Sequence, residues 1–217
     1  EDYDIRIKHG RATHPLRFWK ESTLQPCLLD AVADLGYDDP SPIQRQAIPV
    51  GLLKRDMIGI AETGSGKTAA FLIPLLSYLQ DLPPEYIARV DVEGPLALIM
   101  APVRELAQQI EEACQKLAKY TQFRSLSIVG GESITEQSNK LRQGVEIVVG
   151  TPGRLLDCIN SHYMVLSQCN YLVLDEADRM IDMGFEESLV QIIGESEPES
   201  ELGYCVCVHV VCLYMCI

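Results

Sequence analysis

The feature that most constrains the fold is a glycine-rich loop, residues 61–68, with the sequence AETGSGKT. It lies between the apolar run 57–60 and a helical pattern that extends from residue 68 to residue 79. In a strand–loop–helix unit of this kind, glycines let backbone N–H groups turn toward phosphate oxygens, and the helix start adds unpaired N–H donors. The sequence therefore predicts a phosphate-binding loop in an α/β fold. The alternative is an ordinary flexible turn, and Ala61 stands where the generic loop pattern has Gly.

Charged and hydroxyl side chains at the end of this loop suit a nucleotide with its metal ion. Lys67 is expected to reach the terminal phosphates, and the Thr68 hydroxyl to ligate Mg²⁺, which takes few protein ligands. A second acidic ligand is then needed, and Asp175 follows the short apolar run 171–174. Glu176 would orient and deprotonate an attacking water. The acidic run 175–178 could also be a solvated helix start, but two such segments, each behind a strand-like run, favour an ATP-Mg²⁺ site.

Strand-like and helical patterns alternate along the chain. The helical pattern 105–120 is an example of the second kind, and the apolar strand-like runs are 57–60, 96–100, 126–129, 145–149 and 171–174. Such alternation predicts an α/β domain, a doubly wound, mostly parallel sheet with helices on both faces. The segment 81–94, rich in Pro and charge, is expected to be an exposed loop.

Further segments occur in a fixed order between residues 19 and 186: GYDDPSPIQ at 36–44, APVRELA at 101–107, Gly130-Gly131, and TPGR at 151–154. Together with the Ala-leading loop and Asp-Glu-Ala-Asp, they resemble the first lobe of a DEAD-box RNA helicase. The resemblance implies a RecA-like P-loop NTPase lobe over residues 19–201. It leaves an N-terminal flank, residues 1–18, and an atypical tail, residues 202–217, without a second helicase lobe.

The resemblance also assigns roles to individual residues. Gln44 would read the adenine edge through its amide, and Trp19 would stack on the base. The nucleotide would further contact Thr63, Gly64, Ser65, Gly66, Lys67, Thr68 and Asp175. The RNA backbone would contact Pro102, Arg104, Gly130, Gly131, Thr151, Pro152, Gly153 and Arg154. Taken singly, these residues have plainer interpretations: Gln44 as a helix-surface amide, Trp19 as core, and the two arginines as solvated helix-start charges.

Two positions depart from the family pattern. Val103 replaces the usual Thr, so a hydroxyl is lost beside Arg104, whereas Ser41 replaces Thr and keeps its hydroxyl. The flanking segments resemble the spliceosomal branch of the family, which implies a role in pre-mRNA splicing, a nuclear location and spliceosomal protein partners. The expected function is thus an ATP-dependent RNA helicase, weakly active or inactive as this single lobe. The rival hypotheses are a non-catalytic or dominant-negative ATP-binding module and, less favoured, a DNA translocase.

The charge of the chain is unusual for an RNA-binding protein. The net charge is −13, and the seven acidic residues that follow Arg179 account for only part of it. Because affinity for a polyanion comes largely from Lys and Arg, RNA contact is expected to be local, through backbone amides and a few arginines. The sequence shows no signal-like segment, and the longest apolar run is too short to span a bilayer.

Cysteines are scattered except at the C-terminal end. Cys27, Cys114, Cys158 and Cys169 lack metal-ligand spacing and are expected to be reduced structural thiols, whereas the other four of the eight lie in 204–217. Three hypotheses account for this Cys- and Val-rich segment: a metal site, whose spacing matches no common zinc pattern; an authentic buried strand; and sequence foreign to the family. The third is favoured because the composition changes abruptly after residue 201. Foreign sequence of this kind could still fill the position of a strand, because Val and Cys are apolar.

Overall fold

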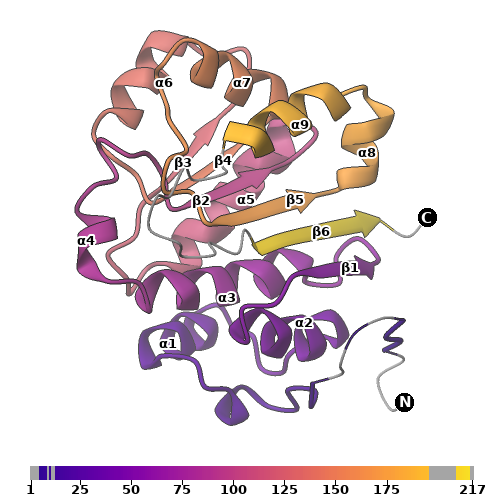
Figure 1. Cartoon of the computed structure of the whole chain (residues 1–217). Helices are drawn as coiled ribbons and strands as arrows, with labels where there is room; N and C mark the ends of the chain where they lie inside the picture. Colours follow the sequence, from indigo (N-terminus) through magenta and orange to yellow (C-terminus); the bar gives the residue numbers. More distant parts are fainter. Residues whose placement is uncertain (1–4, 9, 11–12, 196–208, 216–217) are drawn as a thin grey trace.

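A six-stranded, wholly parallel sheet organises the molecule, with strand order β1-β6-β5-β2-β4-β3 (Figure 1). The computed structural model describes residues 5–8, 10, 13–195 and 209–215, the last range as backbone only. The strands are β1 Met57–Ala61, β2 Ala97–Met100, β3 Ser125–Ile128, β4 Ile147–Gly150, β5 Tyr171–Asp175 and β6 His209–Met215.

Helices cover both faces of this sheet. One face carries α1 Pro26–Asp34, α2 Pro42–Leu52, α3 Lys67–Gln80 and α5 Arg104–Leu117. The other carries α6 Ile134–Leu141, α7 Pro152–Asn160, α8 Ala177–Asp182 and α9 Glu186–Glu195. A short helical turn, η1 Trp19–Glu21, precedes α1. In Figure 1, α1 to α3 lie below the sheet, and α6, α7 and α9 lie above it.

Alternate side chains of the central strands supply two separate cores. Ile99 and Val173 belong to the cluster with α3 and α5, whereas Leu98 and Leu172 belong to the cluster with α7 and α9. Each of these four side chains is at most 1% exposed. Strands buried on both faces are apolar at every position, which explains the continuous apolar runs in the sequence. The prediction of a doubly wound α/β fold is confirmed.

Most predicted elements are present with shifted ends. β4 begins at Ile147 rather than residue 145, and α5 ends at Leu117 rather than residue 120. The segment 81–94 was expected to be a loop, but it contains the four-residue helix α4 Pro84–Ile87. Pro84 at the first helical position fixes the backbone angle that this short turn requires.

The atypical tail contributes β6 to the middle of the sheet. Val211 lies opposite Met57 of β1 and Val173 of β5. The backbone of 209–215 thus joins β1 to the rest of the sheet. The structure describes no side chains of this strand, so the hypothesis of a metal site falls outside the described part of the chain.

Candidate nucleotide and RNA sites

The glycine-rich loop adopts a conformation that requires its glycines. It connects β1 to α3, and Gly64 and Gly66 have φ of 76° and 88°, in the left-handed region. A Cβ on Gly66 would lie 2.5 Å from the Gln44 side-chain nitrogen. Any other residue at Gly66 would therefore be strained in its backbone and would collide with Gln44.

Polar groups of this loop point inward. Lys67 is 9% exposed and its Nζ donates to the Ala61 carbonyl at 2.6 Å. The Ser65 hydroxyl oxygen is buried without a hydrogen-bond partner among the described residues. Thr63 is exposed, whereas Thr68 is half-buried in the first turn of α3. The ammonium, the hydroxyl and the start of a 14-residue helix form a cradle suited to phosphate.

Asp175 lies at the carboxyl end of β5, separated from β1 by one strand. It is 4% exposed, and its Oδ1 has no partner among the described residues. Burial, and then the neighbouring Glu176 carboxylate, raise the pKa of Asp175 to about 6, against the opposing effect of the Lys67 charge. A buried carboxylate with a free oxygen near a cationic loop is suited to a hard cation.

Glu176 has a strained backbone and a side-chain partner. Its φ of 53° lies in the left-handed region, which a non-glycine residue adopts at a cost in energy. Its Oε2 accepts a hydrogen bond at 3.0 Å from Nη1 of Arg179 in α8. The predicted role of Glu176 in activating water stays a prediction. The Arg179 contact was not predicted, although the spacing of three residues on a helix could have indicated it.

Gln44 and Ser41 bind the glycine-rich loop directly. The Gln44 amide nitrogen donates to the Gly66 carbonyl at 3.1 Å, and the Ser41 hydroxyl donates to the Ser65 carbonyl at 2.6 Å. The Gln44 oxygen also accepts from the Ser41 N–H, forming a capping box at the start of α2. Because Gln44 is 5% exposed, its interpretation as a helix-surface amide is wrong. Contact with adenine stays a prediction.

Trp19 is part of the core beside α1 to α3. It is 8% exposed and belongs to the same buried cluster as Leu16 and Leu24. Its indole nitrogen is buried without a partner among the described residues. This burial agrees with the interpretation of Trp19 as a core residue, and stacking on a base stays a prediction.

A second group of predicted residues gathers around the loop after β3. Gly131 has a φ of 83°, and a Cβ there would lie 2.2 Å from Arg104 Nη1, so the arginine passes close over the loop. Arg154 Nη2 donates to the Glu132 carbonyl at 3.2 Å, and its Nη1 is buried without a partner among the described residues. The structure thus brings together two arginines that lie 50 residues apart in sequence.

Neither of the helix starts beside these arginines is capped by a side chain. Val103 precedes α5 and has no hydroxyl with which to cap it. Thr151 precedes α7 and also makes no cap. Pro102 and Pro152 are buried, whereas Gly130 and Gly153 are half-buried, so these four can approach a ligand mainly through the backbone.

Unpartnered buried polar atoms are concentrated at these two sites. Seven side chains of the described part carry one: Trp19, Ser65, Ser125, Gln137, Arg154, Gln168 and Asp175. Four of them, Trp19, Ser65, Arg154 and Asp175, were predicted from the sequence as binding residues. Because most buried polar atoms in proteins are hydrogen-bonded, the unpartnered atoms of these four residues are candidates to bind a ligand.

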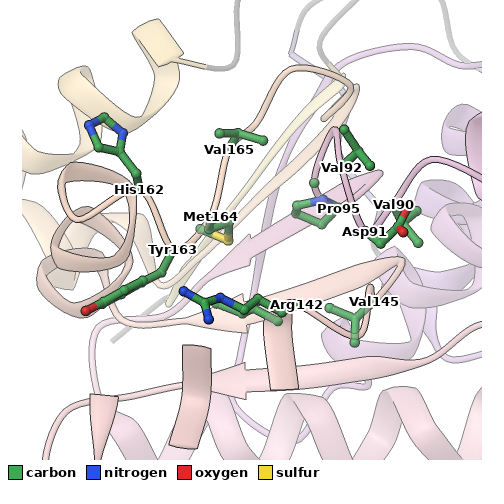
Figure 2. Close-up of a pocket in the computed structure, with 12 residues that line it drawn as sticks. Val90, Asp91, Val92, Pro95, Arg142, Val145, His162, Tyr163, Met164 and Val165 are labelled. Carbon is green, nitrogen blue, oxygen red and sulfur yellow. The ribbon is translucent and has the colours of Figure 1, made fainter. Parts of the chain in front are cut away.

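A cavity of about 160 Å³ lies elsewhere, at the amino ends of β2 and β4 (Figure 2). Its walls come from the loops around Val92 and Val165 and from Arg142 after α6. None of the predicted site residues lines it. Since ligands of open α/β sheets gather at the carboxyl ends of the strands, this cavity does not lie where a nucleotide is expected.

The cysteines that the structure describes are not bonded to one another. Cys27, Cys114, Cys158 and Cys169 are free, and burial raises the pKa of the Cys114 and Cys169 thiols to about 12. These two are therefore unreactive structural thiols. Within the described ranges, His, Cys, Asp and Glu form no cluster of three or more suited to a metal. No helix among the same residues is long and apolar enough to span a membrane.

Fold and site together define a P-loop nucleotide-binding lobe. The family model for DEAD/DEAH box helicases matches residues 41–208, and the chain belongs to that family. The match extends seven residues into the atypical tail.

Relatives and solved structures indicate which members of the family this chain is similar to. The chain is 60% identical over 194 residues to the pre-mRNA-splicing ATP-dependent RNA helicase PRP28 of Gibberella zeae, covering 89% of this chain and 27% of that protein. It is 54% identical over 193 residues to the probable ATP-dependent RNA helicase DDX23 of Homo sapiens, covering 89% and 24%. The Chaetomium thermophilum Prp28 structure bound to ADP has a TM-score of 0.80 at 50% identity, covering 96% and 47%. Yeast Prp28 gives 0.90 at 41%, covering 98% and 49%. The chain thus spans about a quarter of its curated relatives.

Proposed function

We propose that this chain is the first lobe of an ATP-dependent RNA helicase of the Prp28 type, binding ATP-Mg²⁺ at the carboxyl edge of its sheet. One observation carries the proposal: the glycine-rich loop and Asp175 both lie at this edge, on strands separated by one other strand. They are close enough for the Lys67 charge to lower the pKa of Asp175. The Chaetomium thermophilum Prp28, to which this chain is similar, was solved bound to ADP, which supports a nucleotide site in this chain.

The residues of this edge have distinct tasks in the proposal. Lys67 neutralises the terminal phosphates, while Thr68 and Asp175 hold Mg²⁺. Bound ATP-Mg²⁺ supplies a terminal phosphoryl group that water attacks in line. Glu176 orients that water and accepts its proton. Gln44 reads the adenine edge while it keeps the loop in place through Gly66.

The loop after β3 and the starts of α5 and α7 bind the RNA backbone. Arg104 and Arg154 supply forked guanidinium groups, which match phosphate oxygens in pairs. Gly153 and Arg154 lie at the start of α7, where backbone N–H groups lack helical partners. Because no base-reading surface is involved, we expect little sequence specificity. The resemblance to splicing helicases extends the proposal to spliceosomal RNA and protein partners in the nucleus.

Nucleotide binding and RNA-stimulated phosphate release test this function. Lys67→Ala should abolish binding of a fluorescent ATP analogue, whereas Lys116→Ala, at an exposed lysine near the end of α5, should leave it unchanged. Phosphate release that RNA stimulates, even weakly, supports the enzyme. Binding without any release would support a non-catalytic module, and equal ATP affinity in Lys67→Ala and the unaltered protein would refute the site.

A further inference from the structure

The loop 130–132, which contains the glycine pair, is held by a buried glutamine from the next helix. Gln137 in α6 is 2% exposed. Its side-chain nitrogen donates to the Val129 carbonyl at 3.0 Å and to the Glu132 carboxylate at 3.1 Å. One amide group thus binds both sides of Gly130 and Gly131, closing the loop from within the protein.

Three helices converge on Glu132 through this arrangement. Its carboxylate accepts from Gln137 in α6 and, at 3.4 Å, from Gln108 in α5. Its carbonyl accepts from Arg154 in α7. Arg104, the first residue of α5, passes close to Gly131. The position of the loop therefore sets the position of the Arg154 guanidinium, while the glycine leaves room for that of Arg104.

We propose that Gln137 is a positioning residue for RNA binding: by fixing the loop 130–132, it orients Arg154 toward an RNA phosphate without touching RNA itself. The proposal rests on the RNA-binding function proposed above. Burial excludes a direct contact by the Gln137 side chain. A guanidinium held in place in advance loses less conformational entropy on binding, so losing the loop contact should weaken RNA binding.

The chain offers a matched control for the test. Gln168 is also a buried glutamine, 4% exposed, and its nitrogen donates to a backbone carbonyl, that of Gly94, at 2.7 Å. It lies between α7 and β5, at the amino ends of the strands, whereas the two arginines lie at the carboxyl ends. Replacing either glutamine by Met removes a buried amide, keeps the length of the side chain and leaves the charge unchanged. Gln168→Met thus controls for general loss of stability.

The test measures single-stranded RNA affinity by NMR titration of the 217-residue protein, which detects weak binding at low salt. Gln137→Met should weaken RNA binding about tenfold, as expected for the loss of one charge-assisted hydrogen bond. It should also flatten the slope of log affinity against log salt by about 0.7, the value for one phosphate on a single strand. ATP affinity should persist, and Gln168→Met should keep RNA affinity.

A double variant and a second signal make the test decisive. In an Arg154→Ala background, Gln137→Met should cause little further loss; full additivity would overturn the proposal. Unchanged RNA affinity in Gln137→Met, with a loss in Arg154→Ala, would overturn it too. If Arg154→Ala and wild type bind RNA equally, the proposed RNA face fails instead. In that case the NMR signal of the Arg154 side chain decides whether Gln137 positions it. Gln137→Met should make this side chain mobile, and an unchanged signal would refute the positioning role.

Discussion

Asp175 couples the stability of the fold to its capacity for metal. Burial chiefly raises the pKa of Asp175 from its ordinary value of 3.8 to about 6, so folding favours the protonated carboxyl over the carboxylate. Stability from this group is complete below pH 3.8 and is lost as pH rises to about 6. A rise of the pKa from 3.8 to about 6 corresponds to roughly 3 kcal/mol of folding free energy. At neutral pH the ionised Asp175 therefore destabilises the fold by about this amount.

Replacing the carboxylate with an amide isolates this effect. Urea unfolding of Asp175→Asn and the unaltered protein, without nucleotide or Mg²⁺, gives the difference in unfolding free energy at each pH. We expect the variant to gain relative stability by about 1.4 kcal/mol per pH unit between about pH 4 and pH 6, and then to level off. Asp182→Asn, at an exposed carboxylate on α8, controls for the loss of one negative charge.

Binding should change in the opposite direction. Asp175→Asn should lose the increase in ATP affinity that Mg²⁺ gives to the unaltered protein, because an amide carries no charge to attract the cation. The variant would then be more stable and less functional, a trade-off common at binding sites. A stability difference that stays constant between pH 4 and pH 7 would refute the burial argument. Mg²⁺-dependent affinity retained in the variant would remove Asp175 from the metal site.

Three further predictions concern nucleotide choice, the RNA loop and turnover. Gln44→Ala should relax the preference for ATP over GTP in competition binding, whereas Gln46→Ala, on the same helix but bonded to Thr13, should not; unchanged selectivity would remove Gln44 from base reading. Gly131→Ala should weaken RNA binding because its Cβ would displace Arg104, whereas Gly184→Ala, with a similar φ of 81° and no atom within 4 Å, should not; equal affinities would refute the contact. The 217-residue chain alone should hydrolyse ATP slowly and unwind no duplex. Arginine fingers raise the rate of hydrolysis by about 10³- to 10⁵-fold, and no arginine follows Arg179 in this chain. Rapid unwinding would contradict the need for a second lobe.

Local motifs made much of the nucleotide site predictable from sequence. The glycine-rich loop and the segment 175–178 each combine a strand end, a turn and reactive side chains within a few residues. The alternation of apolar runs and helical patterns likewise predicted the layers of the fold. These features depend on neighbours in the chain, so a single sequence contains them.

Contacts between distant segments were harder to predict. Ser41 and Gln44 reach the glycine-rich loop across 24 and 22 residues, respectively. Gln137 is buried because of how α6 packs on the sheet, and no local pattern indicates which polar side chain a core will enclose. The role of Gln137 in holding the loop 130–132 can be inferred only once the structure shows its hydrogen-bond partners.

The strand β6 shows how weakly a position in a sheet constrains sequence. A central parallel strand needs apolar side chains and free backbone N–H groups, and many sequences rich in Val and Cys satisfy both. Its presence therefore supports a structural role without revealing the origin of the segment.

Backbone pairing supplies the test of that role. Val211→Pro removes an N–H from a strand that pairs on both sides, so the free energy of unfolding should fall by about 1–3 kcal/mol, the cost of a buried carbonyl that loses its donor. Val211→Thr keeps the N–H and the branched shape and should be much milder. Nucleotide affinity should fall with Val211→Pro, because β6 lies between β1, which leads into the glycine-rich loop, and the strand that carries Asp175. Equal stability of the two variants would show that 209–215 does not pair in the sheet, and β1 would then need another neighbour.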